Sequence, residues 1–189
     1  MGTLIVTENI TLDGVIEQTG DWFTPAGDQP AVDHGDIEVT LRHHMATQAA
    51  LLLGRKTFES FRDYWPAQTD DTTGITAHLN RVPKYVLSRT LDEPAWEHTT
   101  LLRGEVTDVV GRLKQEVDGE IGVTGSITLV HGLIAAGLVD EYRLFVYPVV
   151  LGDGRRLFEN GSGVPKLTLT AATPYRSGVV LLAYRSVGA

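Results

Sequence analysis

The sequence predicts an α/β protein in which helices cover both faces of a mostly parallel sheet. Short apolar runs that end at glycine or at small polar residues alternate with segments whose apolar residues recur at helical spacing. This alternation is typical of β-α-β units. Near the C-terminal end, residues 166–173 and 179–186 have strand composition and lie on either side of Ser177-Gly178, which predicts an antiparallel hairpin.

The first fifty residues predict a strand, a loop and a helix. Residues 3–7 are rich in β-branched and apolar side chains, as in a buried strand. Residues 10–30 are polar and contain several glycines, so we expect a loop that serves as a ligand lid. In residues 34–48 apolar side chains recur at every fourth position, which predicts a helix, and Asp33 is placed to be its N-cap.

The middle of the chain predicts two buried strands. Residues 50–53 form a short apolar run that ends at Gly54, as expected for a central strand covered on both faces. Residues 57–61 begin a helix, and the pattern of residues 62–80 is irregular. Residues 84–87 predict a second buried strand, and the stretch that follows Ser88-Arg89-Thr90 is interpreted as a connector.

Two helices and two strands follow. Residues 106–117 have regular helical spacing, and Gly119 follows as a stop signal. Residues 121–123 predict a strand, residues 127–136 a helix and residues 141–147 a further strand.

Length and composition indicate one globular domain. A chain of 189 residues suits a single core, and a hydrophobic fraction of 42% with a charged fraction of 21% is ordinary for such a protein. We therefore expect a single domain over residues 1–189.

Charge and residue types argue against several classes of function. The net charge is −8 and the basic residues are scattered, so nucleic acid is a poor partner. The chain has no cysteine, which excludes thiolate nucleophiles and zinc-thiolate sites. His43 and His44 are adjacent and would point about 100° apart on a helix, so we predict no metal site. Neither a signal peptide nor a membrane-spanning run is visible, and we expect a cytoplasmic protein without a membrane partner.

Three corners at the ends of predicted strands carry groups that suit phosphate. Gly54-Arg55-Lys56-Thr57 lies where a strand turns directly into a helix, so amides at the positive helix end face outward beside Arg55. Ser88-Arg89-Thr90 offers a hydroxyl and a guanidinium for a ribose 2′-phosphate. Thr124-Gly125-Ser126 is a third corner, where the small Gly125 lets a pyrophosphate approach the backbone.

Each corner taken alone also has an ordinary structural interpretation. Gly54 and Gly125 then merely permit turns, and the basic residues beside them are solvated. Because ligands of such folds gather at the carboxyl ends of parallel strands, we expect the three corners to converge on one ligand.

The order and spacing of these corners resemble the dihydrofolate reductase superfamily. The stretches that carry the resemblance are residues 52–60, 85–90 and 123–126, preceded by the lid loop. Within the superfamily, residues 138–142 and 148–154 are similar to the reductase domain of riboflavin synthesis and its stand-alone relatives. The resemblance implies a three-layer α/β/α dihydrofolate-reductase-like fold, an NADPH cofactor and a homodimer.

The resemblance assigns each half of NADPH to a group of residues. The adenosine half is expected at Arg55, Thr57, Ser88 and Arg89, beside Gly54; the pyrophosphate at Gly125, Ser126 and Ile127; and the nicotinamide near Val15 and Ile16. The folate enzymes usually have two adjacent glycines at the third corner, whereas this chain has Ser126 in the second position.

Acidic residues are candidates for proton transfer, because the protein must supply or organise a proton when the cofactor supplies hydride. An ungapped count back from Gly54 places Glu38 where the folate enzymes have an acidic residue that serves the pterin, and Asp36 is a possible substitute. As an alternative, both are solvated residues at a helix start, where acidic side chains are favoured.

Three further residues are candidates for contact with the substrate. Asp13 lies in the lid, although it also suits a simple turn. Arg155 and Arg156 follow Gly152-Asp153-Gly154 and would suit the phosphate of a phosphoribosyl group, with a solvated basic loop as the alternative.

The function expected from the resemblance is NADPH-dependent reduction of a small polar heterocycle, of the 5-amino-6-(5-phosphoribosylamino)uracil type found in riboflavin synthesis. Two alternatives stay open. One is dihydrofolate reduction, and the other is a non-catalytic ligand-binding or dimerisation module on the same fold.

Overall fold

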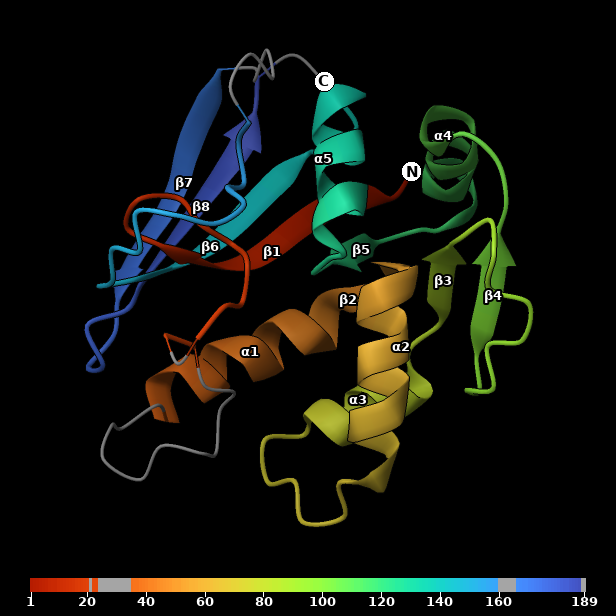
Figure 1. Cartoon of the computed structure of the whole chain (residues 1–189), viewed down its shortest axis with the longest axis horizontal. Helices are drawn as coiled ribbons and strands as arrows, with labels where there is room; N and C mark the ends of the chain where they lie inside the picture. Colours follow the sequence, from red (N-terminus) through yellow and green to blue (C-terminus); the bar gives the residue numbers. More distant parts are fainter. Residues whose placement is uncertain (21, 24–34, 160–165, 188–189) are drawn as a thin grey trace.

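An eight-stranded sheet formed by the described residues runs through the molecule (Figure 1). The computed structural model describes residues 1–20, 22–23, 35–159 and 166–187. The strands are β1 (Thr3–Thr11), β2 (Gln48–Gly54), β3 (Lys84–Leu87), β4 (Thr99–Leu102), β5 (Glu120–Val123), β6 (Glu141–Tyr147), β7 (Leu167–Pro174) and β8 (Val180–Ser186).

Their order in the sheet is β4-β3-β2-β5-β1-β6-β8-β7. Neighbouring strands from β4 to β6 are parallel, whereas β8 runs antiparallel to β6 and β7 antiparallel to β8. The prediction of a mostly parallel sheet with a C-terminal antiparallel hairpin is therefore confirmed.

Helices cover both faces of the sheet. They are α1 (Gly35–Thr47), α2 (Arg55–Tyr64), the 3₁₀ turn η1 (Trp65–Ala67), α3 (Ile75–Arg81), α4 (Val106–Glu116) and α5 (Ile127–Ala135). None of these helices in the described ranges is long and apolar enough to cross a membrane.

Alternation along the strands explains the layers. Leu52 of β2 packs in the cluster that contains α4 and α5 side chains, whereas its neighbours Leu51 and Leu53 pack with Phe58 of α2 and Leu79 of α3. Successive side chains of a strand point to opposite faces. Helices α2 and α3 thus lie on one face and α4 and α5 on the other. Ile37 and Leu41 of α1 pack with Phe145 of β6. The neighbouring residue Leu144 belongs to the cluster of α4 and α5, so Phe145 and α1 lie on the opposite face, which is the face of α2.

Some predicted boundaries were wrong. Strand β1 runs to Thr11 rather than ending at residue 7, because Glu8 and Asn9 interrupt the apolar pattern but still pair with Leu144 and Phe145 of β6. The first residues of the predicted lid therefore belong to a strand.

Three short elements were missed. Strand β4 lies in the stretch interpreted as a connector, and the end of α2, η1 and α3 occupy the stretch interpreted as irregular. These elements are short, and β4 forms the edge of the sheet with residues that are half-buried or exposed, so little apolar periodicity marks them. The predicted N-cap Asp33 and lid residues 21 and 24–30 lie outside the described residues.

Replacing Phe58 tests the anchoring of α2. Its ring is fully buried and lies 5.9 Å from the ring of Trp96. We expect Phe58→Ala to lower the free energy of unfolding by about 3–5 kcal/mol, because the truncation leaves a cavity. Urea denaturation measures this. Val39→Ala, at an exposed position of α1, should change stability by less than about 0.5 kcal/mol; equal losses in the two variants would contradict the anchoring role.

Candidate active site at the carboxyl ends of the strands

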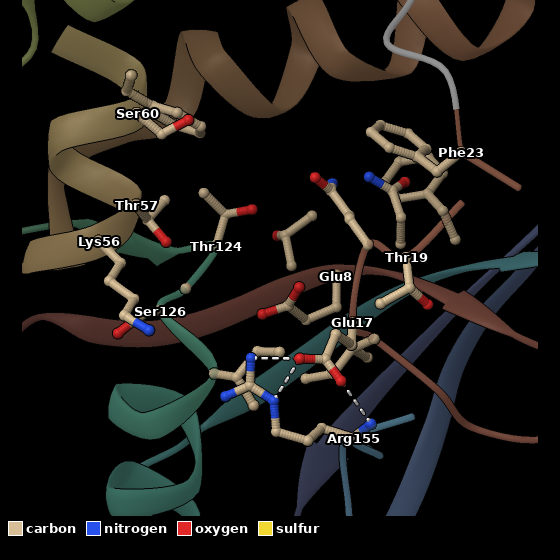
Figure 2. A pocket seen from close by; sticks show the side chains of 18 of the residues that line it. Glu8, Glu17, Thr19, Phe23, Lys56, Thr57, Ser60, Thr124, Ser126 and Arg155 are labelled. Carbon is tan, nitrogen blue, oxygen red and sulfur yellow. Dashed lines mark hydrogen bonds and ion pairs between the residues drawn. The ribbon is translucent and has the colours of Figure 1, made fainter. Parts of the chain in front are cut away.

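A cavity of about 720 Å³ opens at the carboxyl ends of the parallel strands. Its wall combines residues from β1, the segment after it, α1, α2, the β5–α5 turn and β6. Figure 2 shows Thr57, Thr124 and Ser126 on one side and Thr19 and Phe23 on the other, with Glu8 between the two sides. Segments far apart in the sequence thus meet at the edge of the sheet where the fold class predicts a ligand.

The first and third predicted corners touch each other. The amide of Gly54 donates a hydrogen bond of 3.1 Å to the carbonyl of Gly125. Gly125 has φ +122°, and a Cβ built there would lie 2.7 Å from Oγ1 of Thr57. The peptide bond between Gly125 and Ser126 is cis. The Thr57 side chain packs against Gly125 where a Cβ would stand, and Thr57, Gly125 and Ser126 together line one wall of the cavity.

This wall has features that suit an anion. Gly54, which has no side chain, is the N-cap of α2, and Ser126 is the N-cap of α5. Within the described residues the Ser126 hydroxyl makes no hydrogen bond to the first-turn amides of α5. Both positive helix ends therefore keep donors available for an anion. Lys56 adds a cationic side chain to the same wall.

The second corner joins the first outside the cavity. Nη1 of Arg55 donates to Oγ1 of Thr90 at 2.7 Å, and Nε of Arg55 donates to Glu59 at 2.8 Å. Arg89 pairs with Glu105 at 2.6 Å, and its side chain is 75% exposed. Oγ of Ser88 accepts hydrogen bonds from the amides of Thr90 and Leu91. The two guanidiniums therefore lie on the surface near the carboxyl ends of β2 and β3.

Asp13 and Arg156 tie two loops together and lie outside the cavity lining. The carboxylate of Asp13 accepts bonds from Oγ1 of Thr11 at 2.7 Å and from the amide of Gly152 at 2.9 Å. The bond from Thr11 is the main reason that the pKa of Asp13 falls to about 2. Nε of Arg156 donates to the carbonyl of Asp13 at 3.0 Å. The segment after β1 is thereby fixed to the loop that follows β6.

The same two loops, after β1 and after β6, bring Glu17 and Arg155 to the cavity wall. Nη2 and Nε of Arg155 lie 2.6 and 2.8 Å from Oε1 of Glu17, and the pair is visible in Figure 2. The hydrogen bond from Arg155 lowers the pKa of Glu17. Ile16 lines the cavity beside this pair, whereas Val15 is fully buried.

The two acids assigned to proton transfer point elsewhere. Glu38 lies 3.7 Å from Arg42 on the same helix, and Asp36 accepts a bond of 3.0 Å from the amide of Arg176. That bond is the main cause that lowers the pKa of Asp36. Helix α1 presents the apolar side chains of Ile37 and Leu41 to the cavity instead. The structure brings neither acid to the cavity wall.

Glu8 is the residue that sequence reasoning missed. Its carboxyl lines the cavity although the residue is only 8% exposed, and Oε1 has no hydrogen-bond partner among the described residues. Burial raises the pKa of Glu8 to about 8. A signal is present in the sequence, since Glu8 continues the alternation of Leu4 and Val6, but a charged side chain breaks the apolar run that predicts a buried strand.

The pH dependence of stability tests the burial of Glu8. In the unfolded chain its pKa is about 4.5 and in the folded protein about 8. Its contribution is therefore most favourable below pH 4.5 and is lost as pH rises to about 8, by about 1.4 kcal/mol per pH unit. Relative to the wild type, Glu8→Gln should gain stability steadily between pH 5 and 8 in urea denaturation.

Glu17→Gln is the matched control, because the pKa of Glu17 is lowered rather than raised. Its stability relative to the wild type should not rise over the same pH range. Parallel pH profiles for the wild type and Glu8→Gln would contradict the burial of a protonated carboxyl.

Comparison with known proteins agrees with this geometry. The model of the family described as the RibD C-terminal domain matches residues 2–181. The uncharacterized protein YyaP of Bacillus subtilis (strain 168) is 30% identical over 186 residues, which cover 96% of this chain and 93% of YyaP.

Two solved structures have the same fold. A protein of Shewanella sp. PV-4, described as a candidate riboflavin biosynthesis protein, has a TM-score of 0.73 at 20% identity, with 98% of this chain and 99% of that chain covered. Dihydrofolate reductase from Enterococcus faecalis, complexed with NADP(H) and RAB-propyl, has a TM-score of 0.61 at 18% identity, with coverage of 98% and 96%. The chain therefore belongs to the RibD C-terminal domain family and has the dihydrofolate-reductase-like fold.

Proposed function

We propose that the protein is an NADPH-dependent reductase that acts on a small polar heterocycle. One observation carries the proposal: the corners at Gly54 and Gly125 meet in a glycine turn next to two helix N-termini on one wall of a 720 Å³ cavity, and a buried carboxyl, Glu8, faces the same space. Membership of the RibD C-terminal domain family supports a reductase.

The residues of the three corners suit the parts of NADPH. The turn at Gly125 and Ser126, with Thr57 and Lys56 beside it, would hold the pyrophosphate. Arg55 and Arg89, together with Ser88, would hold the adenosine half and its 2′-phosphate, because guanidiniums bind phosphate with two parallel donors. Ile16 would border the nicotinamide, which supplies hydride when bound.

The rest of the cavity suits a flat, polar acceptor. Phe23 and Tyr147 lie edge to face with ring centroids 5.7 Å apart, and both line the cavity. Apolar ring walls with a few polar groups are typical of sites for heterocycles. Given the family, 5-amino-6-(5-phosphoribosylamino)uracil is the first acceptor to test. The phosphate of this acceptor would lie near Arg155, which already forms an ion pair with Glu17.

Cofactor preference tests the assignment of the two arginines. NADPH and NADH are titrated separately against protein fluorescence, and NADPH should bind more tightly. The double variant Arg55→Ala, Arg89→Ala should lose about tenfold or more in NADPH affinity, since each charged hydrogen bond contributes about 1.5–3 kcal/mol, while NADH affinity changes little. Arg42→Ala, an exposed arginine of α1, is the control. Equal affinities of the wild type for the two cofactors would remove these roles.

Turnover tests the reaction itself. Oxidation of NADPH is followed with the phosphoribosylaminopyrimidine and with dihydrofolate in separate reactions, and the pyrimidine should be reduced. Gly125→Ala should abolish turnover, because Ala is strained at φ +122° and its Cβ would meet Thr57. Gly111→Ala in α4 has open space for the Cβ and should keep full turnover.

The outcomes separate the alternatives. Reduction of dihydrofolate without reduction of the pyrimidine would replace the proposed substrate. Tight NADPH binding without turnover of either acceptor would favour the non-catalytic binding module.

A further inference from the structure

The carboxyl of Glu8 stands apart from the other charged groups around the cavity. The described charged residues of the wall are Glu8, Glu17, Lys56 and Arg155. Glu17 and Arg155 neutralise each other in a close ion pair. Burial raises the pKa of Tyr147 to about 12, so this phenol is neutral as well. Burial is the cause that raises the pKa of Glu8.

Among the described acidic residues of the cavity wall, Glu8 is therefore the one that can keep its proton at neutral pH. Glu17, Asp13 and Asp36 all have lowered pKa values, because each carboxylate accepts hydrogen bonds that stabilise its charge. These three carboxylates can accept a hydrogen bond, but they carry no proton that they could donate. In contrast, Oε1 of Glu8 is buried without a partner in the described part of the chain, an arrangement that favours the neutral acid.

The backbone holds this acid in a fixed place. Glu8 lies within β1, and its strand pairs in register with β6 from Ile5 to Thr11, with Glu8 opposite Leu144. Figure 2 shows the carboxyl facing the open space between the side of Thr57 and Ser126 and the side of Thr19. An acceptor that fills this space would lie against the carboxyl, and groups on strands are held more rigidly than groups on loops.

We propose that Glu8 is the catalytic acid that protonates the acceptor as hydride arrives. This inference rests on the proposed function. The acceptor would be a C=N bond whose carbon gains a C–H bond from the hydride that bound NADPH would supply. The π electron pair moves to the nitrogen, which takes the proton from the carboxyl O–H of Glu8. The products are the amine, NADP⁺ and the Glu8 carboxylate, which regains one proton from water.

This role also defines the acceptor. Its reducible double bond must end in a basic atom, such as an imine nitrogen, that becomes more basic as hydride is added. A group that is negatively charged at this point is disfavoured, because a second anion would lie beside the carboxylate left by Glu8 in a poorly solvated place. The charged part of a phosphorylated acceptor must then lie away from Glu8, toward Arg155.

The test compares the wild type with Glu8→Gln, Glu8→Asp and Glu17→Gln. In the wild type, turnover at saturating substrates should fall as pH rises through about 8. Glu8→Gln should bind NADPH within twofold of the wild type but lose about 10²–10⁴-fold in kcat, and the break near pH 8 should vanish. Glu8→Asp keeps a carboxyl, so it should restore part of kcat and keep a break. Glu17→Gln should keep the break of the wild type.

A second readout does not depend on activity. Glutamate labelled with ¹³C at Cδ should give one signal that titrates near pH 8, and this signal should be absent from Glu8→Gln. A Glu8 signal that titrates near 4.5 would overturn the inference. So would a Glu8→Gln variant with full turnover and an unchanged pH profile, even though the reductase function would survive. A wild type that binds no NADPH, or reduces neither acceptor, would overturn the proposed function and this inference with it.

Discussion

The hydrogen bond from the Gly54 amide to the Gly125 carbonyl is the contact on which the rest of the site depends. It joins the carboxyl ends of two neighbouring parallel strands, β2 and β5, where each strand is followed by a helix. A side chain at either glycine would push the corners apart, since a Cβ on Gly54 meets Ser126 and a Cβ on Gly125 meets Thr57. Because both residues are glycines, the N-terminal ends of two helices can lie close together, where their backbone donors act on the same ligand.

Hydrogen bonds and an ion pair between two loops shape the side of the cavity that lies opposite Thr57 and Ser126. The two loops after β1 and β6 are held by the contacts of Asp13 with Gly152 and of Glu17 with Arg155, and by backbone bonds such as the one from Ile16 to Arg155. Sequence reasoning gave Asp13, Arg155 and Arg156 to the substrate. In the folded chain these charges pair within the two loops, whereas Oε1 of Glu8 has no hydrogen-bond partner among the described residues.

The sequence predicted the fold well where apolar runs are continuous. Strands β2, β3, β5 and β6 and helices α4 and α5 lie at or near their predicted bounds, because buried elements carry a strong periodic signal. Edge elements such as β4 do not. The family predicted from the three corners is confirmed, whereas the roles of individual residues stay predictions. Glu38 depended on an ungapped count along the chain, and such a count does not register which side of a helix faces a cavity.

The position of Glu8 within a strand has a consequence for how relatives of this fold can diversify. A residue in the interior of a paired strand changes its place only if the whole sheet shifts, whereas the borders of the cavity near Thr19, Phe23 and Arg155 belong to connecting segments. Insertions and substitutions in such segments are tolerated easily. Acceptors of different outline can therefore be admitted by remodelling the rim, while the group that handles the proton stays where it is.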